Sequence, residues 1–154
     1  MKQRLLIIFL ISSFVLVIDR ISKELALVYL QDSSITIIPG FFKLFFIWNP
    51  GIAFGLLGSY QYIVTIIVTL IVLSSLFFLH KIPKRYSIGA ALMIGGAIGN
   101  LTDRLIYGKV IDYFSFISFP IFNVADVAIS IGFCLLLIQE FKESHKKKKS
   151  KKKN

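Results

Sequence analysis

The chain has 154 residues, of which 56% are hydrophobic and only 17% are charged. Soluble proteins average about 45–50% apolar and about 25% charged residues, and a domain of this size leaves much of its surface exposed to solvent. The composition, with a mean hydropathy of +0.77, therefore excludes a water-soluble globule and indicates that lipid surrounds much of the chain.

The net charge of +10 lies mostly at the C-terminal end of the sequence. Residues 142–154 hold eight lysines and one glutamate, so this segment alone carries +7. A lysine run after an apolar segment is typical of an anchor to anionic lipid, and repulsion between its like charges favours disorder. We therefore predict a lysine-rich, disordered cytoplasmic tail at 142–154 and no nucleic-acid partner.

Cysteine and histidine are too few for several kinds of site. The single cysteine, Cys134, excludes an intrachain disulfide. The two histidines, His80 and His145, lie at the end of an apolar run and in the tail, which argues against a histidine-built metal site or a Ser–His–Asp triad. Zinc-protease, nucleophile-elbow and P-loop motifs are absent from the sequence, so we expect neither a metal nor a cofactor.

Four apolar stretches are predicted to cross the membrane as helices, because each has close to the ~20 residues that span ~30 Å of hydrocarbon. They cover residues 5–29, 62–79, 88–106 and 125–141. The first follows two basic residues, as the core of a signal peptide does, but no A-x-A-like cleavage site follows it, so we predict a retained helix. A G-x-x-x-G motif, Gly95 to Gly99, predicts close packing of the third helix.

The placement of basic residues predicts the orientation of these helices. If the N-terminus is cytoplasmic, three inner segments hold thirteen of the eighteen basic residues: 1–4, 81–86 and 142–154. The two outer segments, 31–61 and 107–124, hold two. Because cytoplasmic loops are enriched in lysine and arginine, we predict an all-α polytopic membrane protein with four transmembrane helices and cytoplasmic N- and C-termini. We assign residues 1–141 to one membrane domain.

The outer segments have the composition of strands and turns. Residues 35–57 are rich in β-branched and aromatic side chains, and Pro39-Gly40 and Asn49-Pro50-Gly51 interrupt them. Residues 110–122 are similar in character. We predict a small extracytoplasmic β-element, or a re-entrant segment, that rests at the membrane interface.

Acidic residues inside a membrane are functional candidates, because a carboxylate there costs about 2.5–3.5 kcal/mol. Five of the eight acids fall near the outer end of a predicted helix or in the adjoining segment: Asp19, Glu24, Asp103, Asp112 and Asp126. Some of these acids also suit structural roles. Asp19 has the i, i+4 spacing of a helical ion pair with Lys23, and Arg20 and Glu24 repeat that spacing.

Two further groups of polar residues have alternative structural roles. Asn100, Asp103 and Arg104 end the third predicted helix, where a hydrogen-bonded clasp to neighbouring helices is as reasonable as catalysis. Asn123 and Asp126 have the spacing of an N-cap and the third residue of a helix, which predicts a capped start for the fourth helix.

Asp112 is harder to assign to a structural role. It lies among apolar and aromatic residues, and Lys109 is the only cation near it in sequence. Burial raises the pKa of such an acid, whereas the dipole of a helix N-terminus favours the ionised form of Asp126. Two acids with different proton affinities make an acid/base pair, in which one activates water while the other, protonated, polarises a carbonyl. This pair predicts peptide hydrolysis.

Five polar sequence blocks lie in order along the chain. They are D-R-I-S-K at 19–23, N-P-G-I-A-F at 49–54, G-G-A-I-G-N-L-T-D-R at 95–104, G-K-V-I-D-Y at 108–113 and F-N-V-A-D at 122–126. In this order they resemble the bacterial lipoprotein signal peptidase family, signal peptidase II, and the resemblance extends to about residue 141. It implies a four-helix membrane aspartic peptidase with a small extracytoplasmic β-element. Such an enzyme cleaves the signal peptide of a prolipoprotein just before a diacylglyceryl-modified cysteine.

The motifs also imply roles for individual residues. Asp112 and Asp126 match the catalytic pair of the family. Eight more residues match positions that shape the pocket or hold substrate: Asp19, Lys23, Asn49, Gly51, Asn100, Asp103, Arg104 and Asn123. Asp103 competes with Asp112 as the partner of Asp126, but burial and the motif both favour Asp112. The chain departs from the family at Tyr113, where phenylalanine is usual, and in the short connection between the catalytic acids.

The resemblance implies that a lipid-modified prolipoprotein reaches the site laterally through membrane lipid, on the extracytoplasmic side of the bacterial inner membrane. We expect a monomer without metal or cofactor. The alternative is a proton-coupled carrier or assembly factor that uses the same acids as a relay. Carriers often show repeated halves, and this sequence has no internal repeat. A non-catalytic scaffold would not need acids in an apolar site.

Overall fold

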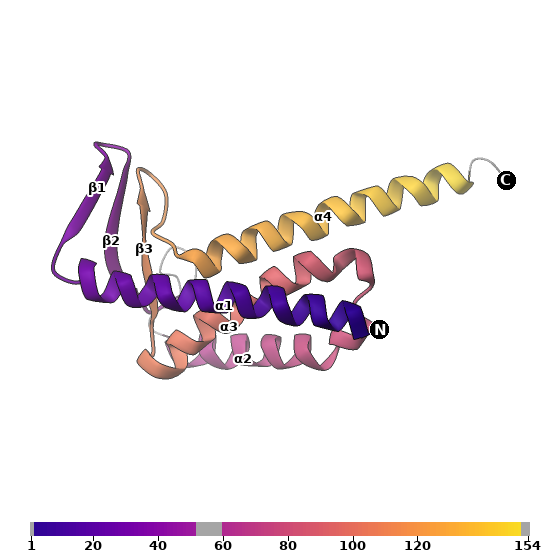
Figure 1. Ribbon diagram of the computed structural model, residues 1–154, viewed down its shortest axis with the longest axis horizontal. Helices are drawn as coiled ribbons and strands as arrows, with labels where there is room; N and C mark the ends of the chain where they lie inside the picture. Colours follow the sequence, from indigo (N-terminus) through magenta and orange to yellow (C-terminus); the bar gives the residue numbers. More distant parts are fainter. Residues whose placement is uncertain (1, 52–59, 152–154) are drawn as a thin grey trace.

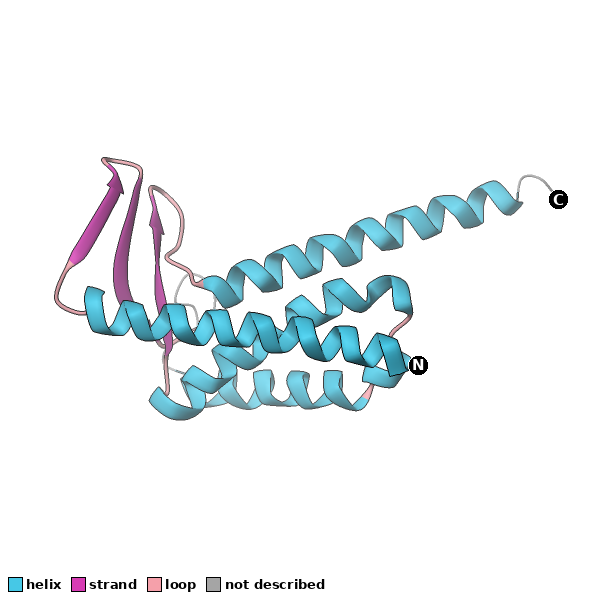
Figure 2. Cartoon of the chain, viewed as in Figure 1, coloured by secondary structure: helices cyan, strands magenta, loops and turns pink. Residues whose placement is uncertain are grey.

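The computed structural model describes residues 2–51 and 60–151. Within them the elements in chain order are α1 Lys2–Leu30, β1 Ser34–Ile38, β2 Phe42–Asn49, α2 Gln61–Phe77, the 3₁₀ turns η3 Leu79–Lys81 and η4 Lys84–Tyr86, α3 Ser87–Tyr107, β3 Val110–Phe116 and α4 Val124–Lys151. The helices form a bundle, and the sheet lies at one end of it (Figure 1, Figure 2). Residues 52–57 of the predicted β-rich segment lie outside the described residues, as do 152–154; the former include Ile52, Ala53 and Phe54 of the second sequence block.

Helix α3 packs against all three of the other helices. Glycine allows its backbone to approach them closely. A Cβ atom at Gly95 would lie 2.8 Å from the carbonyl oxygen of Ser12 in α1, and one at Gly96 would meet the backbone of Ala125 in α4. The close packing that the G-x-x-x-G motif predicted is therefore confirmed.

The outer surface of the bundle is apolar. Helix α1 and the Val124–Lys146 part of α4 are long and apolar enough to span a membrane, and α2 is a shorter apolar helix. Large side chains such as Phe14, Tyr62 and Phe77 are exposed on these helices. Such a surface suits lipid, because its exposure to water costs free energy in proportion to its area. The fold is that of a mostly helical membrane protein, and α1, α2 and α3 begin and end within three residues of the predicted spans.

The strands form one antiparallel sheet in the order β1-β2-β3. The composition of the segments after the first and third helices predicted a small sheet, and this prediction is confirmed. Ile47 of β2 pairs with Asp112 of β3. A short loop after β3 turns the chain back, and Phe122 pairs with Phe114. This return places the start of α4 beside β3.

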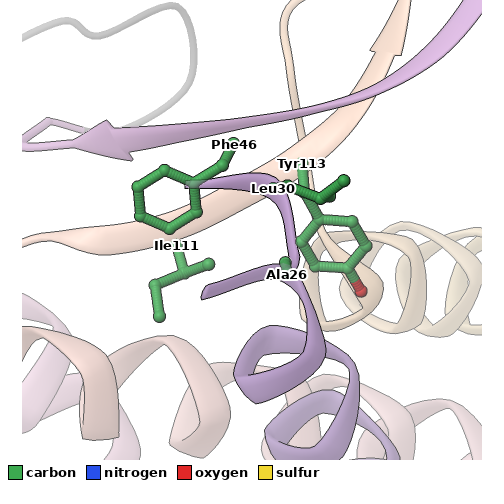
Figure 3. Packing of buried hydrophobic residues seen from close by; sticks show 5 residues of the cluster. All are labelled: Ala26, Leu30, Phe46, Ile111 and Tyr113. Atoms are coloured by element: carbon green, nitrogen blue, oxygen red, sulfur yellow. The ribbon is translucent and has the colours of Figure 1, made fainter. Parts of the chain in front are cut away.

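A cluster of buried apolar residues joins the end of α1 to the sheet: Ala26, Leu30, Phe46, Ile111 and Tyr113. Figure 3 shows these side chains gathered around the end of α1 and the strands. Ile111 and Tyr113 flank Asp112 and are 0% and 4% exposed. Because successive side chains of a strand point to opposite faces, burial of both flanking residues in this core turns Asp112 to the other face of β3.

The lysine-rich segment differs from the prediction of a disordered tail from residue 142. Helix α4 continues to Lys151. Lysine and glutamate are good helix formers, and positive side chains near a C-terminus interact favourably with the helix dipole. Glu143 forms an ion pair with Arg85 at 3.5 Å, and Tyr86 donates a hydrogen bond to Glu140 at 2.6 Å. These contacts connect α4 to η4 at residues 140 and 143, just before and at the start of the lysine-rich segment.

Candidate active site

Asn123 precedes α4 and caps it. Its Oδ1 accepts the backbone N–H of Asp126 at 2.9 Å, and the Asp126 carboxylate accepts the backbone N–H of Asn123 at 3.2 Å. This is the reciprocal capping box that the spacing predicted. The cap fixes the orientation of the Asn123 amide, whose Nδ2 then donates a hydrogen bond to Asp112 at 2.7 Å.

Asp112 lies in β3 and is 1% exposed. One of its carboxylate oxygens accepts from Asn123, and the other accepts from Nδ2 of Asn49, at the end of β2, at 2.8 Å. Burial raises the pKa of Asp112 to about 7, and the negative charge of Asp126 acts in the same direction. The predicted rise of this pKa is confirmed.

Asp126 lies in the first turn of α4, where the helix dipole favours a negative charge. Its Oδ1 accepts a hydrogen bond from Nδ2 of Asn100, in α3, at 2.8 Å. Its Oδ2 accepts the backbone N–H of Asn123. Since Asn123 also donates to Asp112, the structure brings the two acids, one from a strand and one from a helix, into a single hydrogen-bond network.

Both acids line a cavity of about 830 Å³. The polar lining residues include Asn49, Asn100, Arg104, Asp112 and Asp126. The rest of the lining is mainly apolar and comes from α2, α3, the loop before α4 and α4 itself. A largely apolar cavity with a few converging polar groups is typical of a ligand site. This one suits a substrate that is mostly hydrocarbon around one polar reacting group.

Arg104 connects the cavity to the turn after β2. Its Nη2 donates to the carbonyl oxygen of Gly51 at 2.8 Å, and its Nη1 donates to that of Asn100 at 3.3 Å. The backbone N–H of Gly51 in turn donates to Oδ1 of Asn49 at 3.0 Å. These contacts orient the Asn49 amide so that its Nδ2 reaches Asp112.

The remaining predicted site residues, Asp19, Lys23 and Asp103, do not line the cavity. They form a buried ion cluster next to it. Nζ of Lys23 lies 2.8 Å from Oδ2 of Asp19, 2.9 Å from Oδ2 of Asp103, and 2.9 Å from Oδ1 of Asn100. The predicted i, i+4 pair of Asp19 and Lys23 is confirmed. Asn100 is the residue through which this cluster touches the cavity.

Asp103 is fully engaged in structural contacts. Oδ1 accepts from Nη1 of Arg20 at 2.8 Å, and Oδ2 accepts from Lys23 and from the backbone N–H of Ile111. Arg20 also forms the predicted pair with Glu24, but its contact with Asp103 was not predicted, because the two residues lie 83 positions apart. The described residues include no group of three or more histidine, cysteine, aspartate or glutamate side chains arranged to hold a metal ion.

Comparison with known proteins identifies the family. The family model described as signal peptidase (SPase) II matches residues 11–142. The lipoprotein signal peptidase of Moorella thermoacetica is 39% identical over 134 residues, which cover 84% of this chain and 89% of that protein. The lipoprotein signal peptidase of Pelotomaculum thermopropionicum is 37% identical over 150 residues, which cover 95% of this chain and 99% of that protein.

The fold is also shared with a solved structure. A bacterial membrane enzyme, determined by the in meso method at 2.3 Å resolution, superposes with a TM-score of 0.81 and 29% sequence identity, covering 89% of this chain and 88% of that one. These matches confirm the resemblance that the five sequence blocks indicated. The chain therefore belongs to the signal peptidase II family of lipoprotein signal peptidases and is an aspartic endopeptidase of the membrane.

Proposed function

We propose that Asp112 and Asp126 are the catalytic pair of this peptidase. The proposal rests on the position of the two acids, because both line one cavity and both are hydrogen-bonded to Asn123. Asp103 is a poorer candidate, because three donors occupy its carboxylate and it does not line the cavity.

The different surroundings of the two acids support different roles. Asp126, as the carboxylate, takes a proton from a water molecule while the water oxygen attacks the scissile carbonyl carbon. Asp112, as the carboxylic acid, gives its proton to the carbonyl oxygen, which produces a neutral tetrahedral diol. As the C–N bond breaks, Asp126 passes its proton to the departing nitrogen and Asp112 takes a proton back from a diol oxygen. Both acids return to their starting states.

The substrate is a prolipoprotein, whose signal peptide is removed just before the diacylglyceryl-modified cysteine. The mainly apolar lining of the cavity matches the acyl chains and apolar side chains of such a substrate. Asn49 and Arg104 line the polar region of the cavity, and Gly51 is hydrogen-bonded to both; we expect these three residues to hold the substrate near the acids. Asn100 and Asn123 orient the acids themselves.

The enzyme works at the outer face of the bacterial inner membrane. All four helices of the 1–141 domain cross the bilayer, with both termini in the cytoplasm and the sheet on the extracytoplasmic side. The distribution of basic residues supports this orientation, because the connection between α2 and α3, which carries Lys81, Lys84 and Arg85, lies at the end of the bundle opposite the sheet (Figure 1). The enzyme acts as a monomer, and substrate enters laterally from the lipid.

Cleavage of a lipidated prolipoprotein by the purified full-length chain tests the assignment. Asp112→Asn and Asp126→Asn should each abolish turnover while leaving the thermal unfolding temperature close to that of the wild type. Asp32→Asn, at an exposed position, is the matched control and should keep wild-type turnover. Wild-type turnover in either of the first two variants removes that residue from the pair, and complete loss in Asp103→Asn alone moves the role to Asp103.

A further inference from the structure

Each proposed catalytic acid follows a residue whose backbone is held by another buried acid. The N–H of Ile111, just before Asp112, donates to Oδ2 of Asp103 at 3.2 Å. The N–H of Ala125, just before Asp126, donates to Oδ1 of Asp19 at 2.9 Å. The backbone next to each catalytic acid is thus hydrogen-bonded to a side chain of another helix. Asp103 of α3 holds the backbone beside Asp112, and Asp19 of α1 holds the backbone beside Asp126.

Lys23 joins these two anchors. Its ammonium group has three N–H donors, and it has one partner for each: Asp19, Asp103 and Asn100. The side chain is 0% exposed, so water does not compete for these bonds. The third partner extends the connection into the cavity, because Asn100 donates from Nδ2 to Asp126.

The contact with Asn100 also fixes which way that amide is turned. Oδ1 of Asn100 accepts from Lys23 at 2.9 Å and from Nδ2 of Asn123 at 3.0 Å. With its oxygen held by two donors, the amide presents its N–H₂ group to Asp126 at 2.8 Å. Without Lys23, Asn100 loses one of these two donors. Asp19 and Asp103 also lose the cation that connects them.

A simpler explanation is that Lys23 only neutralises the charge of buried acids. Arg20 already supplies Asp103 with a cation at 2.8 Å, so charge balance requires Lys23 at Asp19, whereas the bond from Lys23 to Asn100 neutralises no acid. Arg20 is itself partly exposed, with 27% of its side chain accessible, and its hydrogen bonds go to Asp103, Glu24 and Tyr107 rather than to Asn100. The two cations of the cluster therefore differ in their connection to the active site.

We propose that Lys23 is a positioning residue for the peptidase reaction: through Asp19, Asp103 and Asn100 it sets the relative placement of Asp112 and Asp126. The proposal rests on the assignment of those two acids as the catalytic pair. A displacement of about 1 Å in a catalytic group lowers the rate about 100-fold. Loss of Lys23 therefore lowers kcat, whereas KM changes little because Lys23 does not line the cavity.

Three variants of the full-length chain in detergent test this role, with kcat, KM and the thermal unfolding temperature measured for each. Lys23→Met leaves the buried Asp19 carboxylate without its cation, so we expect the unfolding temperature to fall by about 10 °C and kcat to fall about 100-fold. The double variant Asp19→Asn/Lys23→Met restores the charge balance and keeps an oxygen for the Ala125 N–H. Its unfolding temperature should recover, but its kcat should stay low. Arg20→Met removes the other cation, which makes no bond to Asn100, and should lower kcat much less than Lys23→Met does.

The double variant distinguishes a positioning role of Lys23 from simple charge neutralisation. It does so even if the single variant Lys23→Met does not fold. Recovery of kcat together with the unfolding temperature overturns the proposal, as does a loss confined to KM or an equal loss of kcat in Arg20→Met. Failure of the catalytic assignment is distinguishable, because it shows as turnover in Asp112→Asn or Asp126→Asn. Failure of the Lys23 proposal instead shows as an active Lys23 variant beside two inactive acid variants.

Discussion

The substitution Asn49→Leu tests whether Asp112 must carry a proton during cleavage. Asn49 donates to the Asp112 carboxylate at 2.8 Å, and this bond favours the charged form, so it lowers the pKa of Asp112. Leucine has a similar volume but no donor. The substitution therefore raises the pKa of Asp112 above its wild-type value of about 7.

The size of the effect follows from the strength of that bond. A hydrogen bond to a charged group contributes about 1.5–3 kcal/mol, and 1.36 kcal/mol corresponds to roughly one pKa unit. Because Asn49 is only partly buried, we expect the lower end, a change of about one pH unit. Activity requires protonated Asp112, so it falls as the pH rises through the pKa of this acid. A higher pKa keeps the variant active at higher pH.

The assay is kcat/KM, measured with subsaturating prolipoprotein from about pH 5 to about pH 9, because this quantity reports the pKa values of the free enzyme. The wild type should lose activity on the alkaline side near pH 7, and Asn49→Leu should lose it about one pH unit higher. Thr36→Val makes the same kind of polar-to-apolar change at an exposed position of β1 and should follow the wild type. An alkaline limb of Asn49→Leu that is unmoved, or moved to lower pH, would show that cleavage does not depend on a proton on Asp112.

Two other substitutions test the packing and the cap. Gly95→Ala places a Cβ atom 2.8 Å from the Ser12 carbonyl oxygen, so the free energy of unfolding should fall by about 1–3 kcal/mol; an unchanged thermal unfolding temperature would contradict the close approach of α1 and α3. Asn123→Ser keeps a good N-cap but removes the donor to Asp112. We expect kcat to fall about 10- to 100-fold. The unfolding temperature should also fall, because the buried amide donates to Asn100 and to the Ile111 carbonyl oxygen as well, and wild-type kcat would argue against the role of this amide.

The features that local sequence determines were predictable. Apolar runs close to the membrane thickness locate the helices, because helix length follows directly from residue count. The aromatic and β-branched segments locate the sheet. Asn123 and Asp126 are three residues apart, so their capping box depends on one turn of one helix and could be recognised without knowledge of the tertiary fold.

The contacts that join distant segments were not predictable from spacing. The hydrogen bond between Asp19 and the Ala125 N–H links residues 106 positions apart, and that between Lys23 and Asn100 links residues 77 apart. Resemblance to the family identified these side chains as important, but not their partners. The i, i+4 spacing predicted the ion pair of Lys23 with Asp19, but it could not predict that Nζ of Lys23 also contacts Asp103 and Asn100 of α3.

The most direct test of the central claim compares Asp112→Asn, Asp126→Asn and the double variant in the cleavage of a lipidated prolipoprotein. If the two acids act as one catalytic unit, removal of either one removes the function of both, and losses within such a unit are not additive. All three variants should therefore share the same residual rate. A double variant that is slower than the wild type by the product of the two single losses, or a single variant near the wild-type rate, would contradict this unit.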